Sequence, residues 1–151
     1  MKILVTGCAG FIGSHVCEKL LKRQGVFVIG VDNYDPYYNV KIKKDNINML
    51  KRKYPNFEFI RADIRDMNVI NEWKPKKIIH LASMAGVRNS IKNPELYFDV
   101  NVRGFIRMLE DSITYNIEQI VYASSSSVYG LNESVPFKET DQPEWSCAAS
   151  P

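Results

Sequence analysis

Short apolar runs alternate with amphipathic stretches along most of the chain. The apolar runs have the length and composition of strands buried on both faces, whereas the stretches between them repeat apolar residues every three or four positions, as helices do. We therefore predict strands over residues 2–6, 26–31, 57–61, 77–81 and 118–124. The predicted helices cover residues 11–24, 40–54, 67–73 and 94–115.

The last predicted helix carries the clearest start signal. Asn93 is a favoured N-cap, and Pro94 is favoured at the first helical position. The large apolar residues of this helix are predicted to form one face: Phe98, Val102, Phe105, Leu109 and Ile113. Beyond Gly130 no periodicity remains, so residues 131–151 are expected to form an irregular tail.

Strands that alternate with helices indicate an α/β fold with a parallel sheet and right-handed crossovers. We predict a Rossmann-like, doubly wound sheet in the order 3-2-1-4-5, with its switch point between the first and fourth strands. The length of 151 residues suits one such domain, over residues 1–130, and leaves no room for a second.

Composition excludes several classes of protein. Hydrophobic residues make up 45% and charged residues 25% of the chain, which is typical of a folded globular domain. No apolar run approaches the length of a membrane span. Cys8, Cys17 and Cys147 lack metal-ligand spacing and are expected to be reduced thiols of a cytoplasmic protein. The net charge of +3 is low for a dedicated nucleic-acid binder.

The strongest chemical signal is a Gly-x-x-Gly-x-x-Gly loop between the first strand and the first helix. Gly7 permits a tight turn, Gly10 lets the backbone approach a pyrophosphate, and Gly13 lets helix and strand pack closely. The free N–H groups and the dipole of the helix then face the anion. The alternative is that the glycines merely turn the chain.

Two acidic residues follow neighbouring strands and support a dinucleotide. Asp32 closes the second strand, 19 residues after Gly13, where a carboxylate binds the adenosine ribose hydroxyls and repels a 2′-phosphate. We therefore predict NAD rather than NADP. Asp63 follows the third strand, where it can reach the adenine amino group, although aspartate is also common in ordinary loops.

Six segments together resemble the extended short-chain dehydrogenase/reductase family, within it the nucleotide-sugar epimerases and dehydratases, and most of all the UDP-glucuronate 4-epimerases. The segments are TGCAGFIG (6–13), VDNYDPYY (31–38), RADIRD (61–66), IIHLASMAGVRNS (78–90), NPELYFDVNVRGFIRMLE (93–110) and VYASSSSVYG (121–130).

The resemblance implies NAD as cofactor and assigns residues to it. Phe11 and Ile12 would contact the pyrophosphate through their backbones. Asn33 and Asp35 would join Asp32 at the ribose, and Ile64 would join Asp63 at the adenine. The nicotinamide half would meet the residues Leu81, Ala82, Ser83 and Asn101.

The resemblance also places residues near the substrate. Ser125 corresponds to the residue that bonds the oxidised sugar hydroxyl, and Arg88 to an arginine that faces the substrate cleft. Both Asn101 and Ser125 have a structural alternative. Asn101 could bind the backbone of a neighbouring strand, and Ser125 could be part of a polar strand end. His80 is interpreted as a core residue rather than a catalytic one.

The catalytic pair of the family is missing from the sequence. The resemblance implies a tyrosine base with a lysine four residues later, but Cys147 and Pro151 occupy those places. We therefore expect a truncated NAD-binding homologue that lacks the sugar-nucleotide domain and has no epimerase turnover alone. One alternative is half of a split enzyme, which a second chain would complete so that a UDP-sugar can bind.

A second alternative is a non-enzymatic scaffold or nucleic-acid-associated protein, because residues 41–53 contain six basic side chains. The solvated face of an amphipathic helix explains that segment more simply. Self-association is expected through helix 94–115 or through the edge of strand 119–123.

Overall fold

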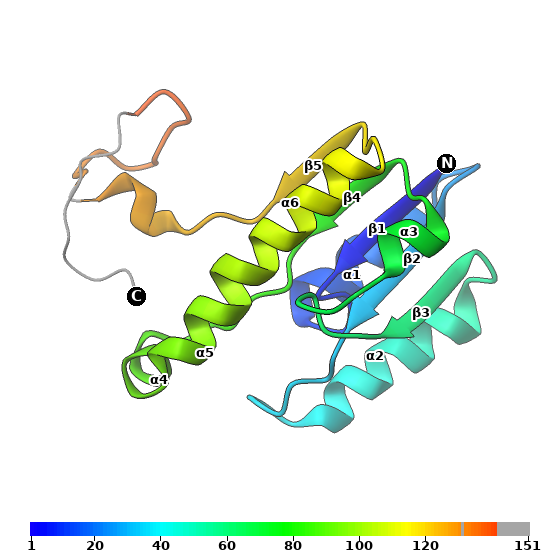
Figure 1. Cartoon of the computed structure of the whole chain (residues 1–151), viewed down its shortest axis with the longest axis horizontal. Coiled ribbons are helices and arrows are strands. Elements are labelled where there is room, and N and C mark those ends of the chain that lie inside the picture. Colours follow the sequence, from blue (N-terminus) through cyan, green and yellow to red (C-terminus); the bar gives the residue numbers. More distant parts are fainter. Residues whose placement is uncertain (131, 142–151) are drawn as a thin grey trace.

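The first strand of the chain lies in the middle of a parallel sheet. In the computed structural model, which describes residues 1–130 and 132–141, the strand order is β3-β2-β1-β4-β5 (Figure 1). The strands are β1 (Lys2–Thr6), β2 (Phe27–Asp32), β3 (Phe57–Arg61), β4 (Lys77–His80) and β5 (Gln119–Tyr122). Every pairing is parallel. The predicted α/β fold class and strand order are confirmed.

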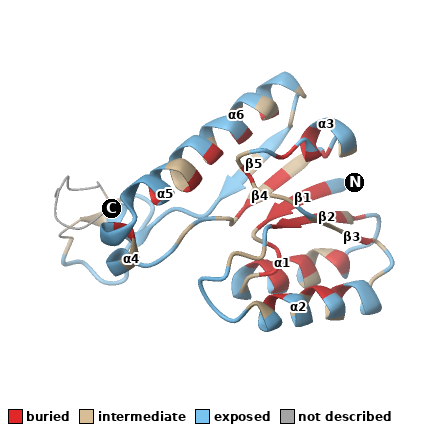
Figure 2. Ribbon diagram, turned by 60° about the horizontal axis from the view of Figure 1, so that its bottom comes forward, coloured by how far each residue is buried: buried red, intermediate tan, exposed pale blue. Residues whose placement is uncertain are grey.

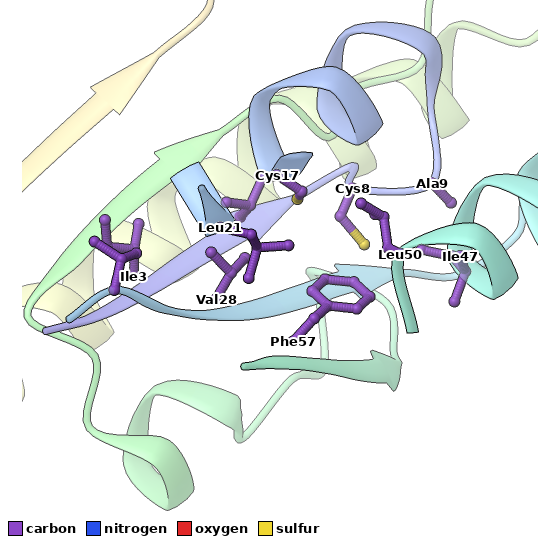
Figure 3. Close-up of a cluster of buried hydrophobic side chains, with 11 residues drawn as sticks. Ile3, Cys8, Ala9, Cys17, Leu21, Val28, Ile47, Leu50 and Phe57 are labelled. Atoms are coloured by element: carbon purple, nitrogen blue, oxygen red, sulfur yellow. The ribbon is translucent and has the colours of Figure 1, made fainter. Parts of the chain in front are cut away.

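Alternate residues of the central strands point to opposite faces of the sheet, and each face is covered by helices. Ile3, Val5 and Val28 pack under α1 (Phe11–Leu21) and α2 (Val40–Lys53), as Figure 3 shows for Ile3 and Val28. Leu4 and Ile29 pack on the other face. That face is covered by α3 (Val69–Trp73) and by the long helix that precedes β5 (Figure 2).

The long helix consists of three parts: α5 (Pro94–Phe98), the π-helical segment η1 (Asp99–Arg103) and α6 (Gly104–Thr114). The predicted face of this helix is wrong. Its buried residues are Tyr97, Val100, Gly104, Met108 and Ser112, whereas Phe98, Val102 and Ile113 are exposed and Phe105 and Leu109 are half-buried.

Small residues explain this difference. A Cβ atom at Gly104 would lie 2.9 Å from Cδ1 of Ile64, so the glycine lets the helix approach the loop after β3. A search for large apolar residues overlooks a contact face that contains glycine and serine. Of the large residues of the other face, Phe98, Val102 and Ile113 remain in solvent.

Further differences from the prediction concern the end of α1 and two short elements. Helix α1 ends at Leu21 rather than at residue 24. Two short elements were not predicted, α4 (Val87–Lys92) and the 3-10 helix η2 (Ser126–Tyr129), because both are too short to show a helical period. Among the described residues, none of the helices combines the length and apolar character that a membrane crossing requires.

A buried hydroxyl joins the ends of β1 and β4. Thr6 Oγ1 accepts hydrogen bonds from the N–H groups of Leu81 and Ala82, each at 3.2 Å, and lies 2.8 Å from Nδ1 of His80. Since both lone pairs accept, the hydroxyl donates its hydrogen to Nδ1, which is then unprotonated. Burial lowers the pKa of His80 to about 4. His80 is a core residue, as predicted.

We expect this histidine to make the fold sensitive to acid. Its pKa of about 4 in the folded chain lies below its ordinary value of 6.5, so the unfolded chain binds the extra proton first and stability falls as the pH drops through this window. Between pH 7 and pH 5 the loss is about 2 kcal/mol. Urea unfolding at both pH values measures this loss of stability in the wild type and in His80→Asn. The variant keeps an acceptor for the Thr6 hydroxyl.

The variant should lose less stability than the wild type over this range. His15→Gln removes an exposed histidine and serves as the control, which should retain the full acid dependence. Equal acid dependence in the wild type and in His80→Asn would contradict the assignment.

Candidate dinucleotide site

A cavity of about 150 Å³ lies at the carboxyl ends of the central strands. Parallel α/β sheets bind ligands at this edge, where the order of the strands reverses. Most of the predicted cofactor residues line the cavity: Gly7, Gly10, Asp32, Asn33, Asp35, Asp63, Ile64, Leu81, Ala82 and Ser83. Tyr38, Lys43 and Met84 also line it and were not predicted.

The glycine loop requires glycine at two positions for different reasons. Gly7 has a φ of 69°, and a Cβ atom there would lie 2.8 Å from the backbone nitrogen of Ala82. A Cβ at Gly13 would lie 2.0 Å from the carbonyl oxygen of Gly7. Helix α1 can therefore begin directly against the loop. Its first N–H groups have no partner within the helix. Phe11 and Ile12, the predicted contacts of the pyrophosphate, are exposed, and neither they nor Gly13 line the cavity.

Asp32 fixes the loop with both of its carboxylate oxygens. Oδ2 accepts the N–H of Ala9 at 3.2 Å, and Oδ1 accepts the N–H of Tyr34 at 2.8 Å. The side chain is buried but lines the cavity. A carboxylate has about four lone-pair sites, so acceptor capacity remains for ligand hydroxyls.

A second carboxylate lies at the other wall. Asp63 accepts hydrogen bonds from Asn33 at 2.9 Å and from Arg65 at 2.8 Å, and Arg65 also pairs with Asp99 at 2.6 Å. The hydrogen bonds from Arg65 hold the pKa of Asp63 well below its usual range, so this acceptor stays ionised. The loop after β2, the loop after β3 and the long helix are thereby connected.

A larger cavity of about 510 Å³ continues beyond residues 81–84, which line both spaces. Asn101, on the π-helical segment η1, bonds the backbone of Met84 twice: it accepts the N–H at 2.8 Å and donates to the carbonyl at 3.0 Å. Asn101 thus binds neighbouring backbone, which is the structural alternative given for it above. The same residue also lines the larger cavity.

Ser125 lines the same cavity, together with Ser124 and Ser127. Its hydroxyl accepts the N–H of Ser127 at 3.1 Å and donates to the Ser127 hydroxyl at 3.0 Å, so it caps the helix η2. Arg88 does not line either cavity. It lines a surface depression with Tyr37 and Lys92, and this depression adjoins the larger cavity at Gly86 and Val87. The predicted places of the catalytic pair, Cys147 and Pro151, lie outside the described residues.

The basic segment 41–53 is not a uniform patch. Lys53 pairs with Glu18 of α1 at 2.7 Å, and Lys43 is buried against the cavity. Lys41, Lys44, Lys51 and Arg52 are exposed. This distribution agrees with an amphipathic helix whose outer face is solvated. Lys43 is one of the cavity residues that were not predicted, because its charge concealed its position on the buried face of the helix.

Comparison with known proteins agrees with this geometry. Residues 4–150 match the family model for GDP-mannose 4,6 dehydratase. Protein CapI of Staphylococcus aureus is 46% identical over 93% of this chain and 42% of its own length. A probable UDP-glucuronate 4-epimerase of Rhizobium meliloti is 40% identical over 94% of the chain and 42% of its own length.

The solved structures include the UDP-glucuronic acid 4-epimerase of Bacillus cereus in complex with UDP-glucuronic acid and NAD. It has a TM-score of 0.85 and 36% identity, and the match covers 95% of this chain and 46% of that protein. The chain spans less than half the length of these relatives. Because the family model covers nearly the whole sequence, the chain belongs to the GDP-mannose 4,6 dehydratase family of nucleotide-sugar epimerases and dehydratases.

Proposed function

We propose that residues 1–130 form the NAD-binding part of a UDP-sugar 4-epimerase, with UDP-glucuronate as the sugar nucleotide. The observation that carries this proposal is the glycine loop and Asp32 held together at the edge of one cavity. The UDP-glucuronic acid 4-epimerase of Bacillus cereus, solved with NAD, supports the choice of cofactor and of sugar.

The residues of the cavity suit the parts of a dinucleotide. The free amides at the start of α1 would bind the pyrophosphate, and Asp32 would accept the ribose hydroxyls. Asp63 and Ile64 would border the adenine. The nicotinamide end would then extend past Ser83 into the larger cavity, where Ser125 lies. NAD, when bound there, would supply a reversible acceptor for the hydride at the sugar carbon.

The Ser125 hydroxyl would orient the sugar hydroxyl by a hydrogen bond. It already bonds Ser127 on both its donor and acceptor sides, so its direction is set before a substrate arrives. Such orientation reduces the entropy lost in reaching the reactive geometry.

We expect the chain to bind NAD and to prefer it to NADP, because the Asp32 carboxylate would repel a 2′-phosphate. Asp32→Asn retains an oxygen for the Tyr34 N–H but removes the charge. It should weaken NAD about tenfold and weaken NADP less, so that the preference shrinks. Calorimetric titration with both dinucleotides measures this. Asp45→Asn, at an exposed position of α2, is the control. No binding of NAD at millimolar concentration would remove the proposed function.

Epimerisation also requires a proton-transfer pair and a sugar-nucleotide site. In the described residues no Tyr-x-x-x-Lys follows Ser125. We expect the 151-residue chain alone to leave a UDP-hexuronic acid unchanged, because loss of a general base by itself lowers a rate by about 10² to 10⁴. Co-expression with a second chain that carries the pair and the sugar domain should restore turnover. Turnover by the purified chain unaided would contradict this expectation.

We also propose that the chain self-associates. Phe98, Val102 and Ile106 are exposed on one face of the long helix. Among the described strands, β5 pairs only with β4, so its other edge is open, and its residue Val121 is exposed. Apolar stripes and open edges of this kind favour pairing.

Sedimentation at micromolar concentration should show an oligomer. Ile106→Glu should shift it towards monomer if the helix forms the contact, and Val121→Glu should do so if the edge strand forms it. Glu110→Gln, an exposed position of α6, is the control. A strictly monomeric wild type would contradict the proposal.

A further inference from the structure

Residues 84–86, which follow β4, lie where the two cavities meet. Met84 lines both cavities, and Gly86 lines the larger one. A dinucleotide that extends from Asp32 in the smaller cavity to Ser125 in the larger one has to pass this segment. The position of segment 84–86 therefore decides how such a ligand crosses from one cavity to the other.

Two side chains of the long helix hold segment 84–86. Asn101 bonds both the N–H and the carbonyl of Met84, at 2.8 Å and 3.0 Å. Tyr97 donates from its hydroxyl to the carbonyl oxygen of Ala85 at 2.5 Å. The two residues are four positions apart on the helix, so their side chains lie on the same face and act on consecutive residues of the segment.

A third side chain contacts the segment from another loop. Gly86 has a φ of 99°, and a Cβ atom there would lie 2.3 Å from the hydroxyl oxygen of Tyr37. Tyr37 belongs to the loop between β2 and α2, which also carries Asp35 and Tyr38 to the smaller cavity. Three consecutive residues are thus each in contact with a different side chain, which leaves the segment little freedom to shift.

The Tyr97 hydroxyl fixes this segment rather than merely satisfying it. Only 6% of Tyr97 is exposed, and the residue lines the larger cavity. Its hydroxyl also accepts a hydrogen bond from Nδ2 of Asn89 in α4, at 3.0 Å. Ala85 is exposed, so water could replace the tyrosine as the partner of its carbonyl group. What the tyrosine adds is a fixed position for the segment.

We propose that Tyr97 is a positioning residue for the nicotinamide half of the dinucleotide, and that it acts by fixing segment 84–86 where that half enters the larger cavity. The proposal rests on the proposed function, because it needs a dinucleotide that spans both cavities. A segment that is already fixed loses less conformational entropy when the ligand binds. A ligand confined to the smaller cavity gains nothing from this positioning.

The competing explanation is that Tyr97 only joins α4 to the long helix through its bond to Asn89. In that case loss of the hydroxyl would lower the stability of the unliganded chain. It would also weaken all ligands alike or leave all of them unchanged. Positioning instead predicts a loss that is confined to the part of the ligand beyond Ser83.

The test is Tyr97→Phe, which removes the hydroxyl and keeps the ring. Asn89→Ala removes the other bond of this hydroxyl, and Tyr115→Phe, at the end of α6 and outside both cavities, is the matched control. Calorimetry measures the affinities for NAD and for ADP, which lacks the nicotinamide nucleoside. Urea unfolding without ligand measures stability.

We expect Tyr97→Phe to weaken NAD about tenfold, as for the loss of one buried hydrogen bond, and to leave ADP within about twofold of the wild type. Asn89→Ala and Tyr115→Phe should bind both ligands as the wild type does. The loss should therefore separate NAD from ADP in Tyr97→Phe alone.

Several outcomes would overturn the proposal. One is an equal weakening of NAD and ADP in Tyr97→Phe, and another is a lower urea midpoint with NAD affinity unchanged. A similar loss of NAD affinity in Asn89→Ala would assign the effect to the joint with α4 instead. If the wild type does not bind NAD, the proposed function itself fails, which differs from a failure of Tyr97 in a chain that binds NAD.

Discussion

The Asp32 carboxylate connects the two loops whose relative positions shape the cavity proposed to bind a dinucleotide. It stands at the end of β2, accepts an N–H from the glycine loop after β1, and accepts a second from the loop that leads to α2. Those two loops carry Gly10 and Tyr38 to the same cavity. The Asp32 carboxylate therefore fixes the backbone of both loops around the cavity without a ligand. Its remaining lone pairs would be available to a bound dinucleotide.

Around this point the site is built from backbone positions more than from reactive side chains. Thr6 fixes the end of β4, Asn101 fixes Met84, and Ser125 caps a short helix. Each of these polar side chains forms a hydrogen bond with a backbone group in a segment that follows β4 or β5, where the ladder of the sheet no longer provides a partner. The strand ends then present a shaped rim with little freedom to rearrange, which reduces the entropy that binding must overcome.

Most of the fold and much of the site could be predicted from the sequence because they depend on local signals. Buried strands, a glycine loop and an acid at a strand end each have a spacing that can be read along the chain. What could not be predicted depends on three-dimensional contact. The sheet-facing side of the long helix uses Gly104, and a search for large residues could not identify it. Lys43 belongs to a buried stripe whose other members are apolar, and its charge masked that membership.

The π-helical segment Asp99–Arg103 has a consequence for how the site tolerates change. Its five residues include Asp99, which holds Arg65 and through it Asp63, and Asn101, which holds Met84 beside the larger cavity. Deleting one residue would return the segment to ordinary α-helix and leave α6 in about the same orientation relative to α5, because roughly four residues of an α-helix cover the angle of five residues of a π-helix. The deletion would instead change the directions of Asp99 and Asn101 relative to each other, since each residue of a π-helix turns through a smaller angle. The extra residue therefore sets the directions of these two side chains and leaves the rest of the long helix in phase.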